Sequence, residues 1–400
     1  MGVVTTFAAA WFASGLGVES PIGVTSDPGS RPLAAPPVVR WAVHLPGAVP
    51  NVATPTEPGG PAVSGREIFV GYSGASALYV LDRRDGQVLQ TIATRASVAT
   101  TPVLLSADRV LVSDSAGYTS TWQRKDGVWA RQWEHYSGAP VVNTPTVVDG
   151  VVYLANVDEL VFALDLASGE LKWRYQHKLD VARSASLELF GAPAPQVAPS
   201  VVYCGFSDGF LVALDRAAGT ELWKSQVGEG TYPDLIAPAV PLADGAVLVA
   251  GYTRPTEHFL PETRSPSWRI DAGSAAAPRI VGDTLYHPGS DGKLRQIDTR
   301  TGAVGWTWDS GTTGPLLTPE LTPQGVLVAS TDSTVFLLDP ATGKERWRLD
   351  PGVLLTGFSA PPAVVGEDVY AVSNGGYLYA LRGRAAPSAP GVADWVTPGR

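Results

Sequence analysis

Residues 161–173 read VFALDLASGELKW, and this segment is the clearest copy of a unit that recurs along the 400-residue chain. In the unit, a glycine follows an aspartate by four residues, and a tryptophan follows the glycine by another four. Four copies keep this spacing, and their positions are Asp165, Gly169, Trp173, Asp215, Gly219, Trp223, Asp298, Gly302, Trp306, Asp339, Gly343 and Trp347. Such regular self-similarity indicates a repeat architecture.

The local chemistry of the unit predicts a β-hairpin. The apolar residues before the aspartate are typical of a buried strand, and the glycine supplies the positive φ angle that a tight turn requires. The next strand carries the tryptophan. Upstream lie further apolar runs, and a proline stands at the first residue of the innermost strand, where it costs no ladder hydrogen bond. These prolines are Pro145, Pro238, Pro319 and Pro362. Each unit is therefore predicted to contain four antiparallel strands and no helix.

The spacing of the units indicates a propeller. The tryptophan positions are 41, 90, 133, 173, 223, 268, 306 and 347, with Gln90 replacing one tryptophan, and they lie 38–50 residues apart. This is the size of a four-stranded propeller blade. The chain is therefore predicted to be an all-β, eight-bladed β-propeller of four-stranded antiparallel blades. Trp268 follows an irregular insertion around residues 253–266, and the number of blades is seven if residues 224–268 are an insertion.

The two ends of the repeat region each hold half a unit. Residues 40–45, which include Trp41, match only the tryptophan half. Residues 377–381 match only the half before the aspartate, and Arg382 stands where the aspartate is expected. Pairing of residues 40–45 with 376–382 would complete the eighth blade and remove an exposed sheet edge. We therefore expect an N-terminal strand to close the ring.

Three regions are expected along the chain: a leader and linker over residues 1–33, the propeller over 34–385 and a C-terminal tail over 386–400. Residues 2–18 carry no charge and resemble the apolar centre of a secretory signal, although no Lys or Arg precedes Arg31. We interpret the leader as an atypical or truncated export signal, with a disordered or strand-like cytosolic leader as the alternative. It has no cysteine and hence no lipoprotein attachment site. The expected location is the periplasm or cell envelope.

Composition and charge argue against several classes of function. The formal net charge is −9 and charged residues make up 17% of the chain, which disfavours nucleic-acid binding. Cys204 is the only cysteine, so neither an intrachain disulfide nor a thiolate zinc site can form. The histidines lack metal-binding spacing, and the chain has no phosphate-loop or serine-hydrolase motif. We expect neither a metal nor a nucleic-acid partner.

The pattern Ala-x-Asp-x-x-x-Gly-x-x-x-Trp resembles the tryptophan-docking repeat of pyrroloquinoline quinone (PQQ) propellers, and the resemblance covers nearly the whole chain after residue 34. Two branches of this superfamily are relevant: the quinoprotein alcohol dehydrogenases and the BamB-like subunits of the outer-membrane β-barrel assembly machinery. The chain is similar in size to the BamB-like members and lacks the large insertions of the dehydrogenases.

The residues that the dehydrogenase branch uses for catalysis can be compared with this sequence. Those enzymes carry an adjacent Cys-Cys disulfide, a calcium or lanthanide ion and a catalytic aspartate, and a single cysteine excludes the disulfide. The aspartates of the repeat occupy one recurring turn position, which favours a structural role. The resemblance therefore implies a non-catalytic scaffold without a cofactor. A PQQ-dependent oxidoreductase and a ligand-binding sensor propeller are the alternatives.

Two loops depart from the repeat, over residues 178–195 and 228–238. In BamB-like proteins the loops at these places contact the barrel-forming partner, with a Leu-x-Leu-Arg pattern in one loop and a pair of acids in the other. Leu187 and Leu189 match the leucines, Phe190 stands in place of the arginine, and Asp234 is the one acid that remains. The resemblance implies a protein partner, such as an outer-membrane barrel assembly protein, bound by a monomeric propeller within a complex. The alternative is that both are ordinary inter-blade loops.

Overall fold

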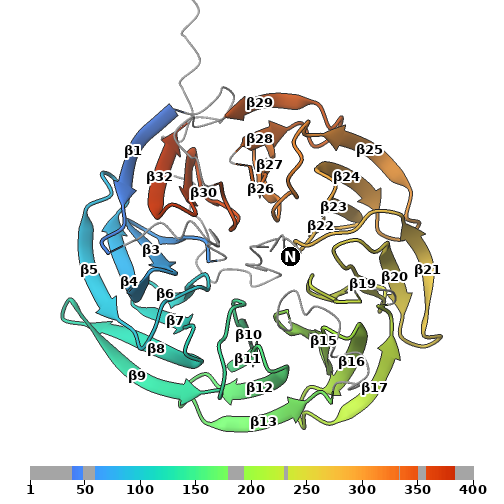
Figure 1. Ribbon diagram of the computed structural model, residues 1–400, viewed down its shortest axis with the longest axis horizontal. Coiled ribbons are helices and arrows are strands. Elements are labelled where there is room, and N and C mark those ends of the chain that lie inside the picture. Colours follow the sequence, from blue (N-terminus) through green and yellow to red (C-terminus); the bar gives the residue numbers. More distant parts are fainter. Residues whose placement is uncertain are drawn as a thin grey trace, which may run out of the picture.

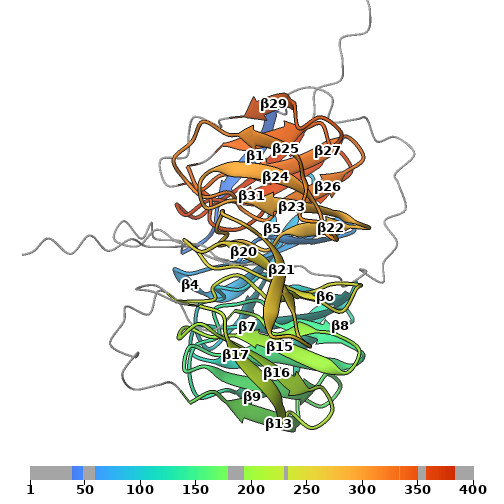
Figure 2. The same ribbon diagram turned by 90° about the vertical axis from the view of Figure 1, so that its right-hand side faces the viewer.

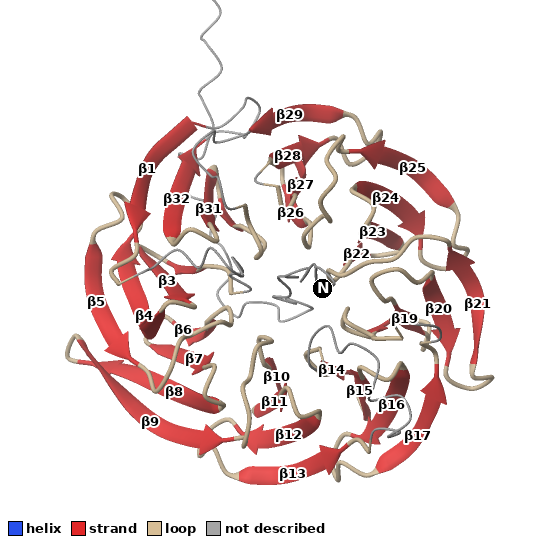
Figure 3. Cartoon of the chain, in the orientation of Figure 1, coloured by secondary structure: helices blue, strands red, loops and turns tan. Residues whose placement is uncertain are grey.

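The computed structural model describes residues 38–47, 59–178, 193–228, 233–332, 334–349 and 357–382, which form eight four-stranded sheets arranged in a ring (Figure 1). Every regular element among these residues is a strand, as Figure 3 shows. No helix that is long and apolar enough to cross a membrane occurs in this part of the chain. The predicted all-β, eight-bladed propeller is confirmed.

Each sheet is one blade, and its strands follow one another from the centre of the ring outward (Figure 1). Blades 1 to 4 comprise β2 (Ala62–Ser64), β3 (Glu67–Tyr72), β4 (Ala75–Asp82), β5 (Val88–Ala93); β6 (Val103–Ser106), β7 (Arg109–Ser113), β8 (Tyr118–Lys125), β9 (Val128–Tyr136); β10 (Thr146–Val148), β11 (Val151–Ala155), β12 (Leu160–Asp165), β13 (Leu171–Gln176); and β14 (Gln196–Val197), β15 (Val201–Gly205), β16 (Phe210–Asp215), β17 (Glu221–Gln226). Blades 5 to 8 comprise β18 (Val240–Pro241), β19 (Val247–Val249), β20 (Thr256–Leu260), β21 (Ser265–Ile270); β22 (Arg279–Val281), β23 (Thr284–Pro288), β24 (Lys293–Asp298), β25 (Val304–Asp309); β26 (Glu320–Thr322), β27 (Gly325–Ala329), β28 (Val335–Leu338), β29 (Glu345–Leu349); and β30 (Ala363–Val365), β31 (Asp368–Val372), β32 (Tyr377–Arg382), β1 (Val38–His44).

Burial follows the place of a strand in its blade. In blade 3, the middle strands β11 and β12 are buried along almost their whole length, whereas most residues of the outermost strand β13 are exposed. Neighbouring blades cover both faces of a middle strand, which explains continuous apolar runs such as residues 161–164. An outer strand meets solvent on one side, so its apolar residues are spaced apart.

The hydrophobic core lies between neighbouring blades. One cluster packs Tyr153 and Ala163 of blade 3 against Val202 and Cys204 of blade 4. Burial of Cys204 also raises the pKa of its thiol. Figure 2 shows the ring from its side, where it is thinner than it is wide. Because each blade buries its faces against its two neighbours, every blade depends on an unbroken ring.

The described residues between β17 and Ile270 form a four-stranded blade of their own, so the seven-blade alternative is wrong. Strands β18 to β21 form one sheet, and β20 pairs with β21 from Thr256↔Ile270 to Leu260↔Ser265. The irregular sequence around residues 253–266 is therefore the third strand and its turn. Leu260 occupies the position of the repeat aspartate, and Arg264 occupies that of the glycine with a φ of 55°.

The N-terminal strand closes the ring, as the sequence predicts. β1 lies along β32 as the outermost strand of blade 8 (Figure 1), with Val38 opposite Arg382 and His44 opposite Tyr377. The eighth blade thus combines strands from both ends of the described chain.

The ring has two faces that carry different connections. Because successive strands of a blade alternate in direction, the first-to-second and third-to-fourth turns emerge at one face, which we call the hairpin face. The second-to-third turns and the connections between blades emerge at the other, which we call the connection face. The described ends of the loops over residues 178–195 and 228–238 lie at the connection face.

Candidate functional site

The repeat tryptophans dock on the turns of the next blade. Trp173 lies against Gly219, where a Cβ would stand 2.4 Å from Cδ2 of the indole ring, and Gly219 also has a φ of 70°. The indole Nε1 donates a hydrogen bond to the carbonyl oxygen of Arg216 at 3.0 Å. The pairs Trp133–Gly169, Trp268–Gly302 and Trp306–Gly343 are built in the same way. Two features of this position therefore require glycine: the positive φ angle of its backbone, and the tryptophan ring that fills the space of a side chain.

The remaining tryptophan positions are variants of this contact. Trp41 lies against Gly86. Trp223 meets Arg264, whose guanidinium carbon lies 4.1 Å from the ring centroid in a cation–π contact. Trp347 is itself buried, and the residues that follow Arg382 lie outside the described part of the chain.

The repeat aspartates are held within their turns. Asp165 Oδ1 accepts hydrogen bonds from the backbone N–H groups of Ala167 at 2.9 Å and Ser168 at 3.0 Å. The equivalent carboxylates make the same bonds at Asp215, Asp298 and Asp339. Hydrogen bonds from Arg346 and the turn lower the pKa of Asp339 to about 2. These carboxylates therefore hold their turns through hydrogen bonds, which is a structural role.

The predicted partner-contact residues fall into two groups. Leu187, Leu189 and Phe190 lie outside the described residues. Asp234 is described and is only 4% exposed, so its side chain is buried within the fold. A buried side chain cannot meet a cation of a partner in this conformation. A role of Asp234 in partner binding stays a prediction.

The described ends of both contact loops meet at one turn of blade 4, residues 206–209. His177, which precedes the first loop, contacts Oδ2 of Asp208 through Nε2 at 2.8 Å. Gly228, the first residue of the second loop, donates its N–H to the carbonyl oxygen of Gly209 at 2.7 Å, and the N–H of Leu235 in the same loop donates to that of Phe206 at 3.2 Å. The two loops therefore leave from adjacent points of the connection face.

A buried carboxylate supports this turn from blade 3. Glu159 is 3% exposed, and its Oε1 accepts the backbone N–H of Ser207 at 2.7 Å. Burial raises the pKa of Glu159, and the hydrogen bond from Ser207 opposes the shift only in part. Within the described ranges, no group of three or more His, Cys, Asp or Glu side chains is placed to hold a metal ion.

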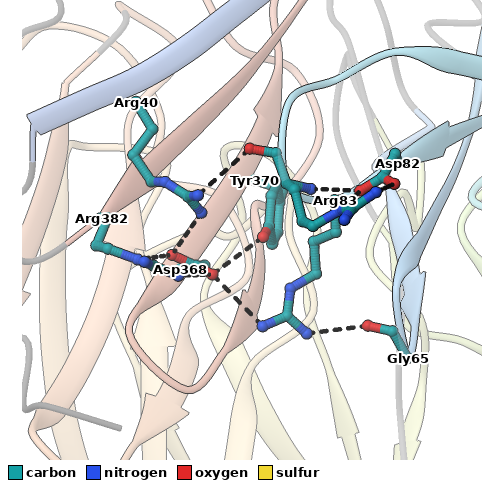
Figure 4. Close-up of polar contacts among 8 residues, drawn as sticks. Arg40, Gly65, Asp82, Arg83, Asp368, Tyr370 and Arg382 are labelled. Carbon is teal, nitrogen blue, oxygen red and sulfur yellow. Dashed lines mark hydrogen bonds and ion pairs between the residues drawn. The ribbon is translucent and has the colours of Figure 1, made fainter. Parts of the chain in front are cut away.

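A second site, which the sequence did not predict, lies at the hairpin face where blade 8 meets blade 1. Figure 4 shows Arg40, Arg83 and Arg382 converging on Asp368, which is buried. Arg382 binds it through two hydrogen bonds, Nε to Oδ1 at 2.6 Å and Nη2 to Oδ2 at 2.9 Å. Arg40 and Arg83 each lie 3.5 Å from the same carboxylate. Asp368 thus joins the last blade, the N-terminal strand and the first blade.

These arginines line a cavity of about 240 Å³, which we call the closure pocket. Its lining residues are Arg40, Gly65, Arg66, Arg83, Arg84, Asp368 and Arg382. The one signal in the sequence was Arg382 at the position of the repeat aspartate. Arg382 lies directly opposite Asp368 in the β31–β32 pair. The positive charge that stands where the repeat has an aspartate therefore faces a negative charge on the neighbouring strand.

Asp368 should stabilise the fold only while it is ionised. Burial favours a higher pKa for Asp368, but the guanidinium groups of Arg382, Arg40 and Arg83 outweigh it, so the pKa lies below its usual value. An aspartate in the unfolded chain has a pKa of about 4. Because the pKa of Asp368 is lower in the folded chain, its carboxylate stabilises the fold at any pH above about 4, and this stabilisation is lost as the pH falls through the folded pKa. We expect the difference in melting temperature between the wild type and Asp368→Asn to be largest near pH 7 and to narrow below about pH 4. Circular dichroism melts across this range provide the test, and a constant difference would contradict it.

The fold and the docking contacts define an eight-bladed propeller built from tryptophan-docking repeats. A family model described as "Outer membrane protein assembly factor BamB" matches residues 106–237 and 217–388, which together exceed half of the chain. The chain therefore belongs to this PQQ-repeat, BamB-like family.

Comparison with solved structures supports the same fold. The crystal structure of BamB from Moraxella catarrhalis superposes with a TM-score of 0.68 at 15% identity, covering 86% of this chain and 99% of the other. The computationally designed Ika8 protein superposes with a TM-score of 0.66 at 16% identity, covering 81% and 95% of the two chains.

One curated relative matches only in part. The serine/threonine-protein kinase AfsK from Streptomyces griseus is 29% identical over 118 residues, which are 28% of this chain. The matched segment covers 15% of the length of that kinase.

Proposed function

We propose that the chain is a non-catalytic, protein-binding propeller of the periplasm or outer-membrane-associated cell envelope, and that it serves the assembly of outer-membrane barrel proteins. The observation that carries this proposal is the match of residues 106–388 to the BamB family model. The single cysteine and the engagement of the repeat aspartates in their turns favour this scaffold over a PQQ-dependent oxidoreductase.

We propose that the partner contact lies on the connection face beside the turn at residues 206–209. Support comes from the described ends of the two loops, which hydrogen-bond to this same turn from both sides of blade 4. A partner that binds both loops would approach the connection face beside this turn. Leu187 and Leu189 of the first loop are proposed to be exposed and to contribute most of the binding energy, because exposed apolar groups often mark protein contacts.

The double variant Leu187→Ala with Leu189→Ala is expected to weaken retention of an outer-membrane barrel protein by at least about tenfold, as loss of a contact centre does. Its free energy of unfolding should change by no more than about 1 kcal/mol, because exposed substitutions are nearly neutral. The measurement is a pull-down from envelope extract with the barrel protein identified by mass spectrometry.

A matched control is the double variant Leu171→Ala with Leu222→Ala. These leucines are 46% and 52% exposed on the outermost strands of blades 3 and 4. The control should retain the partner like the wild type. Equal retention by both double variants, or failure of the wild type to retain any barrel protein, would refute the proposal.

A further inference from the structure

The closure pocket has a counterpart between blades 3 and 4, which serves as an internal reference. That second cavity, of about 510 Å³, has Lys172, Ser200, Asp215, Arg216 and Ala217 in its lining. Both pockets are built from the same positions of the repeat. Arg83 and Arg216 each follow the aspartate of their blade, and each donates its backbone N–H to the turn between the first and second strands.

The two pockets differ in charge. In the reference pocket, both cations have a carboxylate partner: Lys172 lies 3.2 Å from Asp165, and Arg216 lies 2.6 Å from Asp149. The equivalents of Arg66 and Arg84 are the neutral residues Ser200 and Ala217. The closure pocket instead gathers five arginines around one aspartate. This concentration of positive charge occurs in a chain with a net charge of −9.

The carboxylates at the closure pocket do not balance its arginines. Asp368 is bound at both oxygens by Arg382, and Arg40 and Arg83 lie 3.5 Å away. Asp82 is engaged by Arg84, whose Nη2 lies 2.7 Å from Oδ2. Within the described ranges, the Arg66 guanidinium has no carboxylate at ion-pair distance. Glu367 also acts on Arg382, whose pKa is raised by the hydrogen bonds to Asp368 and further by the negative charge of Glu367. The five lining arginines still outnumber these three carboxylates, so an excess of positive charge borders the cavity.

We propose that the closure pocket binds a phosphate group. Arginine presents its N–H donors in a planar fork that matches the oxygens of phosphate, and charge-assisted hydrogen bonds of this kind are strong. A doubly charged phosphate offsets the excess of positive charge better than a singly charged carboxylate does. The volume of about 240 Å³ accommodates a phosphate group and a few attached atoms. The ligand is either a small phosphate ester or the headgroup of an anionic lipid.

The first test uses inorganic phosphate as the probe on the full chain, by isothermal titration calorimetry and thermal shift at constant ionic strength. We expect saturable binding that is stronger than that of acetate. Arg66→Gln should weaken the binding by about tenfold or more, since it removes a charged donor, while the melting temperature without phosphate stays unchanged. Arg84→Gln provides a second variant at the other non-repeat arginine.

The matched control is Arg300→Gln. Arg300 occupies the same turn position in blade 6 as Arg84 does in blade 1, is well exposed, and lies 3.4 Å from Asp283. It should bind phosphate like the wild type. Non-saturable binding, equal binding of acetate, or an unchanged affinity in Arg66→Gln would overturn the proposal.

A second arm distinguishes the two sources of the phosphate group. Co-sedimentation with phosphatidic acid vesicles, lost in Arg66→Gln and competed by free phosphate, would assign the pocket to a lipid headgroup. Binding of free phosphate without co-sedimentation would assign it to a soluble ester. Because the pocket lies on the hairpin face and the proposed partner contact lies on the connection face, the Leu187 and Leu189 variant should bind phosphate normally. The two proposals can therefore fail separately.

Discussion

Replacement of Trp173 by alanine is expected to lower the free energy of unfolding by about 3–5 kcal/mol, as truncation of large buried aromatics does. The indole ring is 7% exposed and fills the space above Gly219, where no side chain can stand. Its loss would leave a cavity between blades 3 and 4 and an unpartnered carbonyl at Arg216. Trp347→Ala is expected to cost a similar amount, because that ring is 4% exposed. Denaturant unfolding provides the measurement.

The control for these variants is Trp122→Ala, which changes the same residue type outside the docking positions. Trp122 is only partly buried, and its Nε1 donates to Ser120 within the same strand. It packs at the border of the core cluster between blades 1 and 2, but its indole N–H is used within its own strand and does not bind the turn of another blade. Its loss should therefore cost less. A larger destabilisation by Trp122→Ala than by both docking variants would show that the tryptophan contacts do not hold the blades together.

Deletion of residues 38–46 is expected to abolish a stable monomer. The deletion removes β1, leaves the outer edge of β32 unpaired and takes Arg40 from Asp368. An unpaired apolar edge templates pairing with other chains, so the product should aggregate. Size-exclusion chromatography with light scattering measures the outcome.

The matched deletion removes residues 1–30, which do not belong to the described strands. It should leave the melting temperature and the monomeric state unchanged. A soluble, monomeric fragment of residues 47–400 with the wild-type melting temperature would contradict the role of β1 in closure.

The fold could be predicted from the sequence because its evidence is local and repeated. The spacing from Asp165 to Gly169 and Trp173 encodes one turn and one docking contact, and the same spacing recurs around the ring. The pattern is not visible in the sequence of blade 5, because Leu260 and Arg264 stand where the aspartate and glycine are expected. The backbone kept the turn nonetheless, with Arg264 at positive φ.

The closure pocket could not be predicted in the same way. Its arginines come from the N-terminal strand, two turns of blade 1 and the last described strand, and only the closed ring brings them together. Arg382 was the one visible irregularity, and its partner Asp368 is fixed by strand register. The burial of Asp234 was also hidden, because it depends on packing of its loop against blade 5, where a Cβ on Gly251 would lie 2.8 Å from the Asp234 carbonyl oxygen.

Ring closure by β1 is the contact on which both the fold and the closure pocket depend, and amide hydrogen exchange of the intact chain tests it most directly. In the closed ring, β32 is bordered by β31 and β1, as β12 is bordered by β11 and β13. We therefore predict that residues 377–382 exchange as slowly as residues 160–165 along both edges of the strand. Fast exchange of the β32 amides that face β1, together with unprotected amides at residues 38–44, would contradict the account.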